Sequence, residues 1–253
     1  MDLGLRGRRA IVTGATRGIG RAISDLLAAE GADIAFCARN NAAVKERVKE
    51  LTSEGVRAFG AAVDVGDGPA YRAWLEAVAR DLGGVDIFIA NASAGAGTEG
   101  EAAWEANFRV DLMHSVRGCE ALLPHLARSD GGAVVFVTTI AAIETFFSPT
   151  AYGALKAALI TYGKQLGQAV AGHGIRINMV SPGPVLFPGG DWDRVRRERP
   201  EVFAEVEGQC ALGRMATPEE VARAVVFLAS PAAGAITGSN LVIDAGFTKR
   251  VQF

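Results

Sequence analysis

Hydrophobic residues follow two alternating patterns along most of the chain. Short, continuous apolar runs, such as residues 34–37, are typical of strands that are buried on both faces. Between them lie longer segments with apolar residues at helical spacing. One of these covers residues 19–30 and is terminated by Gly31. This alternation predicts an α/β protein with a parallel sheet covered by helices on both faces. Right-handed crossovers make such a sheet doubly wound.

The pattern gives approximate bounds for each element. The strands are expected at residues 9–13, 34–37, 58–63, 86–90, 133–138, 176–180 and 240–243. The helices are expected at residues 19–30, 42–53, 69–82, 104–127, 151–171 and 218–229. No linker or repeat interrupts this series, so we expect one domain over residues 1–253. Residues 182–212 are the least regular part and are too long for a mere connection, so we interpret residues 184–212 as a substrate lid.

Composition and charge exclude several classes of protein. With 49 % hydrophobic and 21 % charged residues the chain is an ordinary globular one, and its net charge of −2 does not favour nucleic acid or anionic membranes. Cys37, Cys119 and Cys210 are widely spaced, so disulfides and zinc are not expected, and neither is any other metal. Asp2 and Arg6 stand where a signal peptide needs an apolar run, and no uncharged stretch is long enough to span a membrane. These features predict a cytoplasmic protein.

A glycine-rich segment joins the first predicted strand to the first predicted helix. Its spacing is G-x-x-x-G-x-G, which differs from the common G-x-G-x-x-G dinucleotide fingerprint. Glycines there allow a tight turn and bring a pyrophosphate close to the backbone N–H groups of a helix N-terminus. A glycine-rich turn alone is equally compatible with a structural role, but its position in a βαβ unit favours a nucleotide site. The candidate cofactor-binding residues in it are Gly14, Thr16, Arg17, Gly18, Ile19 and Gly20.

The end of the second predicted strand indicates which cofactor binds. An acidic residue at that place would bind the ribose 2′-OH of NAD, whereas an arginine accommodates the 2′-phosphate of NADP. The strand is followed by Arg39, and Asp33 lies at its opposite end. Together with Arg17, this favours NADP(H). Asp64 and Val65, after the third strand, either contact the adenine or form a turn, and Asn91 either lines the cofactor or satisfies strand ends.

Tyr152 and Lys156 are the leading candidates for chemistry. On a helix, residues four apart lie on one face, so the two side chains can meet. A phenol has a pKa near ~10, and an adjacent ammonium favours the phenolate and lowers that pKa toward the neutral range. Tyr-x-x-x-Lys pairs also arise by chance as a half-buried Tyr beside a solvated Lys, so the pair gains weight only from the motifs around it.

Several motifs occur together in a fixed order: the glycine segment, Asp64-Val65, Tyr152-x-x-x-Lys156 and residues 178–183 (Asn-Met-Val-Ser-Pro-Gly). In this combination the chain resembles the short-chain dehydrogenase/reductase family over nearly its whole length. The resemblance implies a Rossmann fold with a seven-stranded sheet, often assembled as a tetramer. It also implies hydride transfer between a nicotinamide and a carbonyl or alcohol. It further assigns Tyr152, Lys156, Pro182, Gly183 and Val185 to contacts with the cofactor.

The chain departs from the catalytic group of the family at two positions. Thr139 stands 13 residues before Tyr152 (152 − 139 = 13), where the family has a serine, and it keeps a hydroxyl donor. Asp111 stands in Val110-Asp111-Leu112, where the family has an asparagine that helps to hold a water. Asp111 either holds that water or pairs with Lys156. The expected catalytic residues are therefore Tyr152, Lys156, Thr139 and Asp111.

Apolar and aromatic residues in the lid indicate the substrate class. Leu186, Phe187, Trp192 and Phe203 either close over an apolar substrate or pack the lid onto its own domain, and Phe146 with Phe147 form a possible second wall. The leading interpretation is an NADP(H)-dependent oxidoreductase acting on a small-molecule carbonyl or alcohol. Thr139 and Asp111 keep open a cofactor-binding sensor or partner subunit with impaired catalysis. A lyase or epimerase on the same fold is a third possibility.

Overall fold

The sheet is the centre of the fold in the computed structural model, which describes residues 2–96, 100–145 and 149–251. Within these residues every strand belongs to one parallel sheet, ordered β3-β2-β1-β4-β5-β6-β7. This order confirms the predicted seven-stranded, doubly wound Rossmann sheet, whose strand order reverses between β1 and β4. The strands are β1 (Arg9–Thr13), β2 (Asp33–Ala38), β3 (Ala58–Ala62), β4 (Ile87–Ala90), β5 (Ala133–Val137), β6 (Arg176–Pro182) and β7 (Asn240–Ile243).

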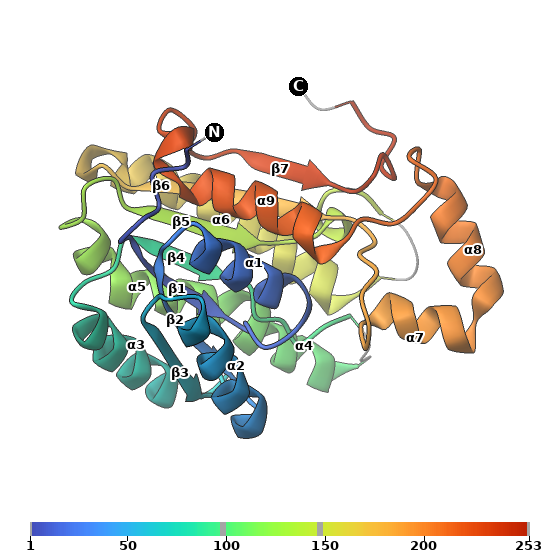
Figure 1. The fold of residues 1–253 in the computed structure, drawn as a ribbon. Helices are drawn as coiled ribbons and strands as arrows, with labels where there is room; N and C mark the ends of the chain where they lie inside the picture. Colours follow the sequence, from blue (N-terminus) through green and yellow to red (C-terminus); the bar gives the residue numbers. More distant parts are fainter. Residues whose placement is uncertain (1, 97–99, 146–148, 252–253) are drawn as a thin grey trace.

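Helices cover both faces of the sheet (Figure 1). One layer consists of α1 (Gly18–Ala29), α2 (Asn41–Ser53) and α9 (Pro218–Ala229), and the other includes α3 (Gly68–Leu82), α5 (His114–Leu126) and α6 (Ala151–Val170). Strand β2 shows why its sequence is apolar throughout. Ile34 and Phe36 pack into the first layer, whereas Ala35 and Cys37 pack into the second. Each strand therefore buries both of its faces.

The single long helix expected over residues 104–127 is interrupted. It consists of α4 (Glu101–Asn107), a π-helical segment (Phe108–Met113) and α5. A π-helical segment adds a residue to a helical turn, and such segments occur frequently at functional sites. Asp111 lies inside this one and is completely buried. The long helix predicted over this stretch is therefore present, but it contains a π-helical segment at the position of a candidate catalytic residue.

The segment expected to be irregular contains two helices, α7 (Asp191–Glu198) and α8 (Pro200–Gln209). They lie at the end of the sheet toward which β7 points (orange in Figure 1). Helix α7 places acidic residues in its first turn and arginines in its last turn, which complements the helix dipole, and α8 begins at Pro200. The other predicted elements end within two residues of their observed bounds. Within the described residues, no helix combines the length and apolar content that crossing a bilayer requires.

Candidate active site

The candidate site residues lie at one edge of the sheet, because the carboxyl ends of parallel strands share that edge. The glycine segment follows β1, and Thr139 follows β5. Tyr152 and Lys156 lie in the first turns of α6, where the Thr150 hydroxyl caps the helix by accepting a hydrogen bond from the Gly153 N–H (3.2 Å). The remaining candidates at strand ends are Arg39 after β2, Asp64 and Val65 after β3, Asn91 after β4, and Pro182, Gly183 and Val185 at and after the end of β6.

The glycine segment forms a tight turn that is tied to the end of β4. The Gly14 N–H donates to the Cys37 carbonyl at 2.8 Å, and the Asn91 side-chain amide donates to the carbonyl oxygens of Thr13 (2.9 Å) and Gly14 (3.2 Å). A Cβ atom on Gly20 would collide with the Gly14 carbonyl and with Asn91. Asn91 thus satisfies strand ends, as one of its two interpretations predicted. The turn leaves the N-terminus of α1 without a side-chain cap, a geometry suited to a pyrophosphate.

Two arginines flank this turn. Arg39 is exposed, and within residues 2–96, 100–145 and 149–251 it makes no ion pair or hydrogen bond. Arg17 is also exposed, and its guanidinium donates a hydrogen bond to the Gly189 carbonyl at 3.3 Å. Asp33 pairs instead with Arg57 (2.7 Å) at the other end of β2. The Asp64 carboxylate accepts from the Gly66 N–H (2.8 Å), which forms a turn. Both arginine side chains are therefore exposed to solvent, and their contact with a 2′-phosphate stays a prediction.

Lys156 is held by two oxygen atoms deep in the site. Its ammonium donates to the Val137 carbonyl at 2.9 Å and lies 3.3 Å from Asp111 Oδ1. The same nitrogen atom lies 5.9 Å from the centroid of the Tyr152 ring. Lys156 and Asp111 have 1 % and 0 % of their side chains exposed, so the pair is shielded from solvent.

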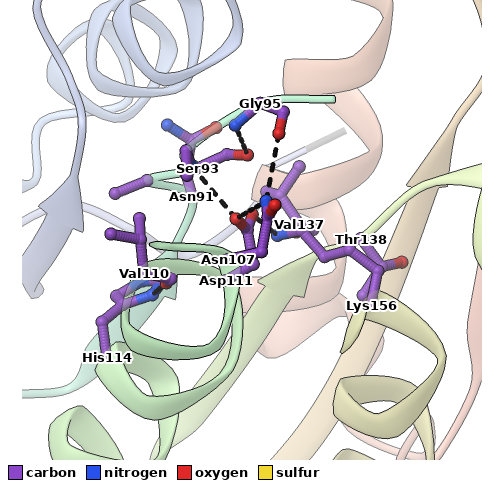
Figure 2. A network of polar contacts seen from close by, with 12 residues as sticks. Asn91, Ser93, Gly95, Asn107, Val110, Asp111, His114, Val137, Thr138 and Lys156 are labelled. Carbon is purple, nitrogen blue, oxygen red and sulfur yellow. Dashed lines mark hydrogen bonds and ion pairs between the residues drawn. The ribbon is translucent and has the colours of Figure 1, made fainter. Parts of the chain in front are cut away.

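Asp111 belongs to a network of polar contacts that Figure 2 shows from close by. Its Oδ2 atom accepts hydrogen bonds from the Asn107 side-chain amide (2.7 Å) and the Ala94 N–H (3.1 Å). The Asn107 amide also donates to the Gly95 carbonyl at 3.0 Å. Oδ1 receives no hydrogen bond and faces the Lys156 ammonium as an ion pair. The sequence analysis missed Asn107, although its position four residues before Asp111 could have indicated a shared helix face.

The pKa of the Tyr152 phenol depends on its burial and on the groups around it. Burial and the negative charge of Asp111 raise the pKa of the Tyr152 phenol above its ordinary value, while a hydrogen bond with Thr139 acts in the opposite direction. Burial lowers the pKa of Lys156, and Asp111 opposes that change. That Lys156 lowers the pKa of the phenol stays a prediction, and in this structure the ammonium is paired with Asp111.

His114 is a second buried residue that the sequence analysis did not assign. Its Nδ1 atom contacts the Val110 carbonyl, and its Nε2 atom lies 3.3 Å from the Thr13 hydroxyl. Burial and the nearby charge of Lys156 lower its pKa to about 4, so the imidazole is neutral at neutral pH. Through Thr13 it connects the π-helical segment to the glycine segment.

The residues expected to form a lid divide into those that are buried in an apolar cluster and those that are only partly buried. Val195 and Phe203 are buried in a cluster with Ile140, Met215 and Phe247, whereas Leu186 and Trp192 are only partly buried at its border. Phe187 packs on the glycine segment, where a Cβ on Gly18 would lie 2.6 Å from its ring. Phe146 and Phe147 lie outside the described residues. Among the described residues, no group of three or more His, Cys, Asp or Glu side chains is arranged to hold a metal.

Comparison with known proteins places this arrangement in a family. Residues 14–248 match the family model described as enoyl-(acyl carrier protein) reductase. The chain is 37 % identical to isoepoxydon dehydrogenase from Penicillium expansum, covering 100 % of this chain and 99 % of the relative. L-sorbose reductase from Gluconobacter frateurii, solved with NADPH and L-sorbose, superposes with a TM-score of 0.91 at 31 % identity, covering 99 % and 100 % of the two chains. A Burkholderia cenocepacia short-chain dehydrogenase in complex with NADP has a TM-score of 0.88 at 30 % identity, covering 96 % and 98 %.

Proposed function

The chain belongs to the short-chain dehydrogenase/reductase family, and from this premise we propose that it reduces a small carbonyl compound with NADPH, or oxidises the corresponding secondary alcohol with NADP. The observation that carries the proposal is the meeting of Thr139, Tyr152 and Lys156 beside a glycine segment built for a pyrophosphate. NADPH in the solved relatives supports the choice of cofactor.

The residues present fit a bound NADP(H). The uncapped N-terminus of α1 and the close backbone packing at Gly14 and Gly20 suit its pyrophosphate, and the positive φ of Gly18 allows the tight turn before the helix. Arg39 and Arg17 would hold the 2′-phosphate through charge-assisted hydrogen bonds. The remaining contacts proposed for the cofactor come from Thr16, Ile19, Asp64, Val65, Asn91, Lys156, Pro182, Gly183 and Val185.

NADPH supplies a hydride to the carbonyl carbon when it is bound. The protein supplies the proton that completes the alcohol. We assign to Thr139 a hydrogen bond that holds and polarises the substrate carbonyl oxygen, and to Tyr152 the proton that this oxygen takes up as negative charge develops on it. Lys156 lies behind the phenol and is held by Val137 and Asp111. In the direction of oxidation, the Tyr152 phenolate accepts the hydroxyl proton.

The lid supports a substrate with a mainly apolar face. We propose residues 184–212 as the lid, with Leu186 and Trp192, which remain partly accessible, facing the substrate. Val195 and Phe203 are buried in the interior of the lid, and we do not assign them to substrate contacts. Ketones, alicyclic alcohols and 3-oxoacyl groups fit this description. We also propose a cytoplasmic homotetramer with one dinucleotide-binding and catalytic domain per chain.

NADPH consumption measured against a panel of substrates tests the proposed function. The panel contains alicyclic ketones, a ketose such as L-sorbose and 3-oxoacyl esters, and alcohols with NADP serve for the reverse direction. We expect turnover with at least one carbonyl compound. The alternative, a cofactor-binding sensor, is favoured by the neutralised Lys156 and the raised phenol pKa. NADPH binding without turnover on any compound of the panel would support that alternative.

A further inference from the structure

A buried chain of contacts runs from the loop after β4 to the catalytic lysine (Figure 2). We propose that Asp111, held in place by Asn107, is a positioning residue that pairs with Lys156 and so neutralises the positive charge that would otherwise favour the Tyr152 phenolate. The inference rests on the proposed carbonyl reductase function. It concerns the protonation of Tyr152, which here has a paired ammonium beside it and not a free one.

The contacts of Asp111 fix the direction in which its charge acts. Asn107 and the Ala94 N–H both donate to Oδ2, so this oxygen atom is occupied. Oδ1 is left facing the Lys156 ammonium at 3.3 Å. Neither side chain is exposed by more than 1 %, and charges shielded from water interact strongly. Asp111 is thus tied on one side to the loop after β4 and is directed on the other side at the lysine.

The charged groups around Tyr152 come from several elements. Lys156 lies on the same helix, Asp111 lies on the π-helical segment, and Asp191 lies at the start of α7. Both carboxylates raise the pKa of the phenol, and burial raises it further. On α5, His114 is neutral. Besides burial, the charges of Lys156 and Arg117 lower its pKa, and the charge of Asp111 raises it. The positive charge of Lys156 therefore does not outweigh the negative charges of Asp111 and Asp191 at the Tyr152 phenol.

The pairing has a consequence for the pH range of each direction. Reduction uses the phenol and oxidation uses the phenolate, so a phenol that keeps its proton extends reduction to higher pH. Oxidation then begins only at more alkaline pH. An enzyme does not change the equilibrium between ketone and alcohol. The pH limits of reduction and oxidation therefore move together when the proton affinity of Tyr152 changes.

The cofactor-free protein allows a direct test by tyrosinate absorbance. The chain has three tyrosines, so the titration of wild type minus that of Tyr152→Phe reports Tyr152 alone. We expect its midpoint in the wild type to lie above the ordinary value of ~10. In Asp111→Asn, the amide oxygen still accepts from Ala94 and Asn107, but an uncharged NH₂ group faces Lys156. We expect this midpoint, and the alkaline limit of kcat/KM for reduction, to fall by about one pH unit or more.

Asp191→Asn is the matched control, because it makes the same chemical change at an exposed carboxylate whose effect is screened by solvent. Its shift should be much smaller. An unchanged Tyr152 midpoint in Asp111→Asn would overturn the inference. A wild-type Tyr152 midpoint below the ordinary value would overturn it as well, and this midpoint can be measured even if Asp111→Asn does not fold. A wild type that reduces no carbonyl would refute the proposed function, and the cofactor-free titration would still decide the inference.

Discussion

The Lys156 ammonium lies 3.3 Å from the Asp111 carboxylate, and both groups are buried. This pair joins α6 to the π-helical segment, and its two residues are 45 positions apart in the chain (156 − 111 = 45). It gives the lysine a partner other than the phenol of Tyr152. The candidate site therefore brings together three titratable groups, of which the Tyr-x-x-x-Lys motif contains two.

Thr139 can be tested by separating its hydroxyl from its shape. Thr139→Val keeps the size of the side chain but removes the donor, so kcat/KM for reduction should fall by about 10²-fold or more. Thr139→Ser keeps the hydroxyl and should stay within about threefold of the wild type. NADPH binding, followed by its fluorescence, should be the same in both variants. Equal activity of the two variants would remove the role that we assign to this hydroxyl.

Arg39 should determine the preference for NADPH over NADH. Because a charge-assisted hydrogen bond contributes about 1.5–3 kcal/mol, Arg39→Ala should raise KM for NADPH by about 10- to 100-fold and leave KM for NADH nearly unchanged. Arg57→Ala is the matched control, since this arginine pairs with Asp33 at the opposite end of β2. A similar rise for both cofactors in Arg39→Ala would mean that the residue does not contact the 2′-phosphate.

His114 should make the stability of the protein depend on pH. Its pKa of about 4 in the folded state lies below the ordinary ~6.5, so the unfolded chain binds the proton first. The stabilising contribution is complete above the ordinary pKa and is lost as the pH falls toward the folded value. Between about pH 7.5 and about pH 5, the free energy of unfolding should fall by about 2 kcal/mol more in the wild type than in His114→Gln. Urea unfolding at both pH values measures this difference, and identical pH dependence in the two proteins would contradict it.

Much of the fold could be predicted because its signals are local. Continuous apolar strands such as β2 bury alternate residues in opposite helix layers, and the helices between them carry regular apolar spacing. The positions of the site residues followed from topology, because the carboxyl ends of parallel strands meet at one edge. Helices α7 and α8 were not predicted, because residues 182–212 lack a long apolar helical spacing, and their signals are instead an acidic first turn in α7 and Pro200 at the start of α8.

The electrostatics of the site could not be predicted from the same motifs. The pKa of Tyr152 depends on Asp111, and the orientation of Asp111 depends on Asn107 and on the loop after β4. These contacts exist only after the π-helical segment has formed and packed against α6. The Val110-Asp111-Leu112 motif offered pairing with Lys156 as one of two roles for Asp111, and the structure shows that pair, but spacing along the sequence does not reveal Asn107 and the Ala94 N–H, which orient the carboxylate.

The most direct test of the account is Tyr152→Phe assayed for NADPH binding and for carbonyl reduction. The variant keeps the aromatic ring and removes only the proton donor, so we predict unchanged NADPH binding and a fall in kcat by about 10³-fold. Tyr162→Phe is the matched control on the same helix, because its ring stacks on Phe136 outside the site, and it should keep the wild-type rate. If Tyr152→Phe reduces the substrate as fast as the wild type, Tyr152 does not donate the proton and the account is wrong.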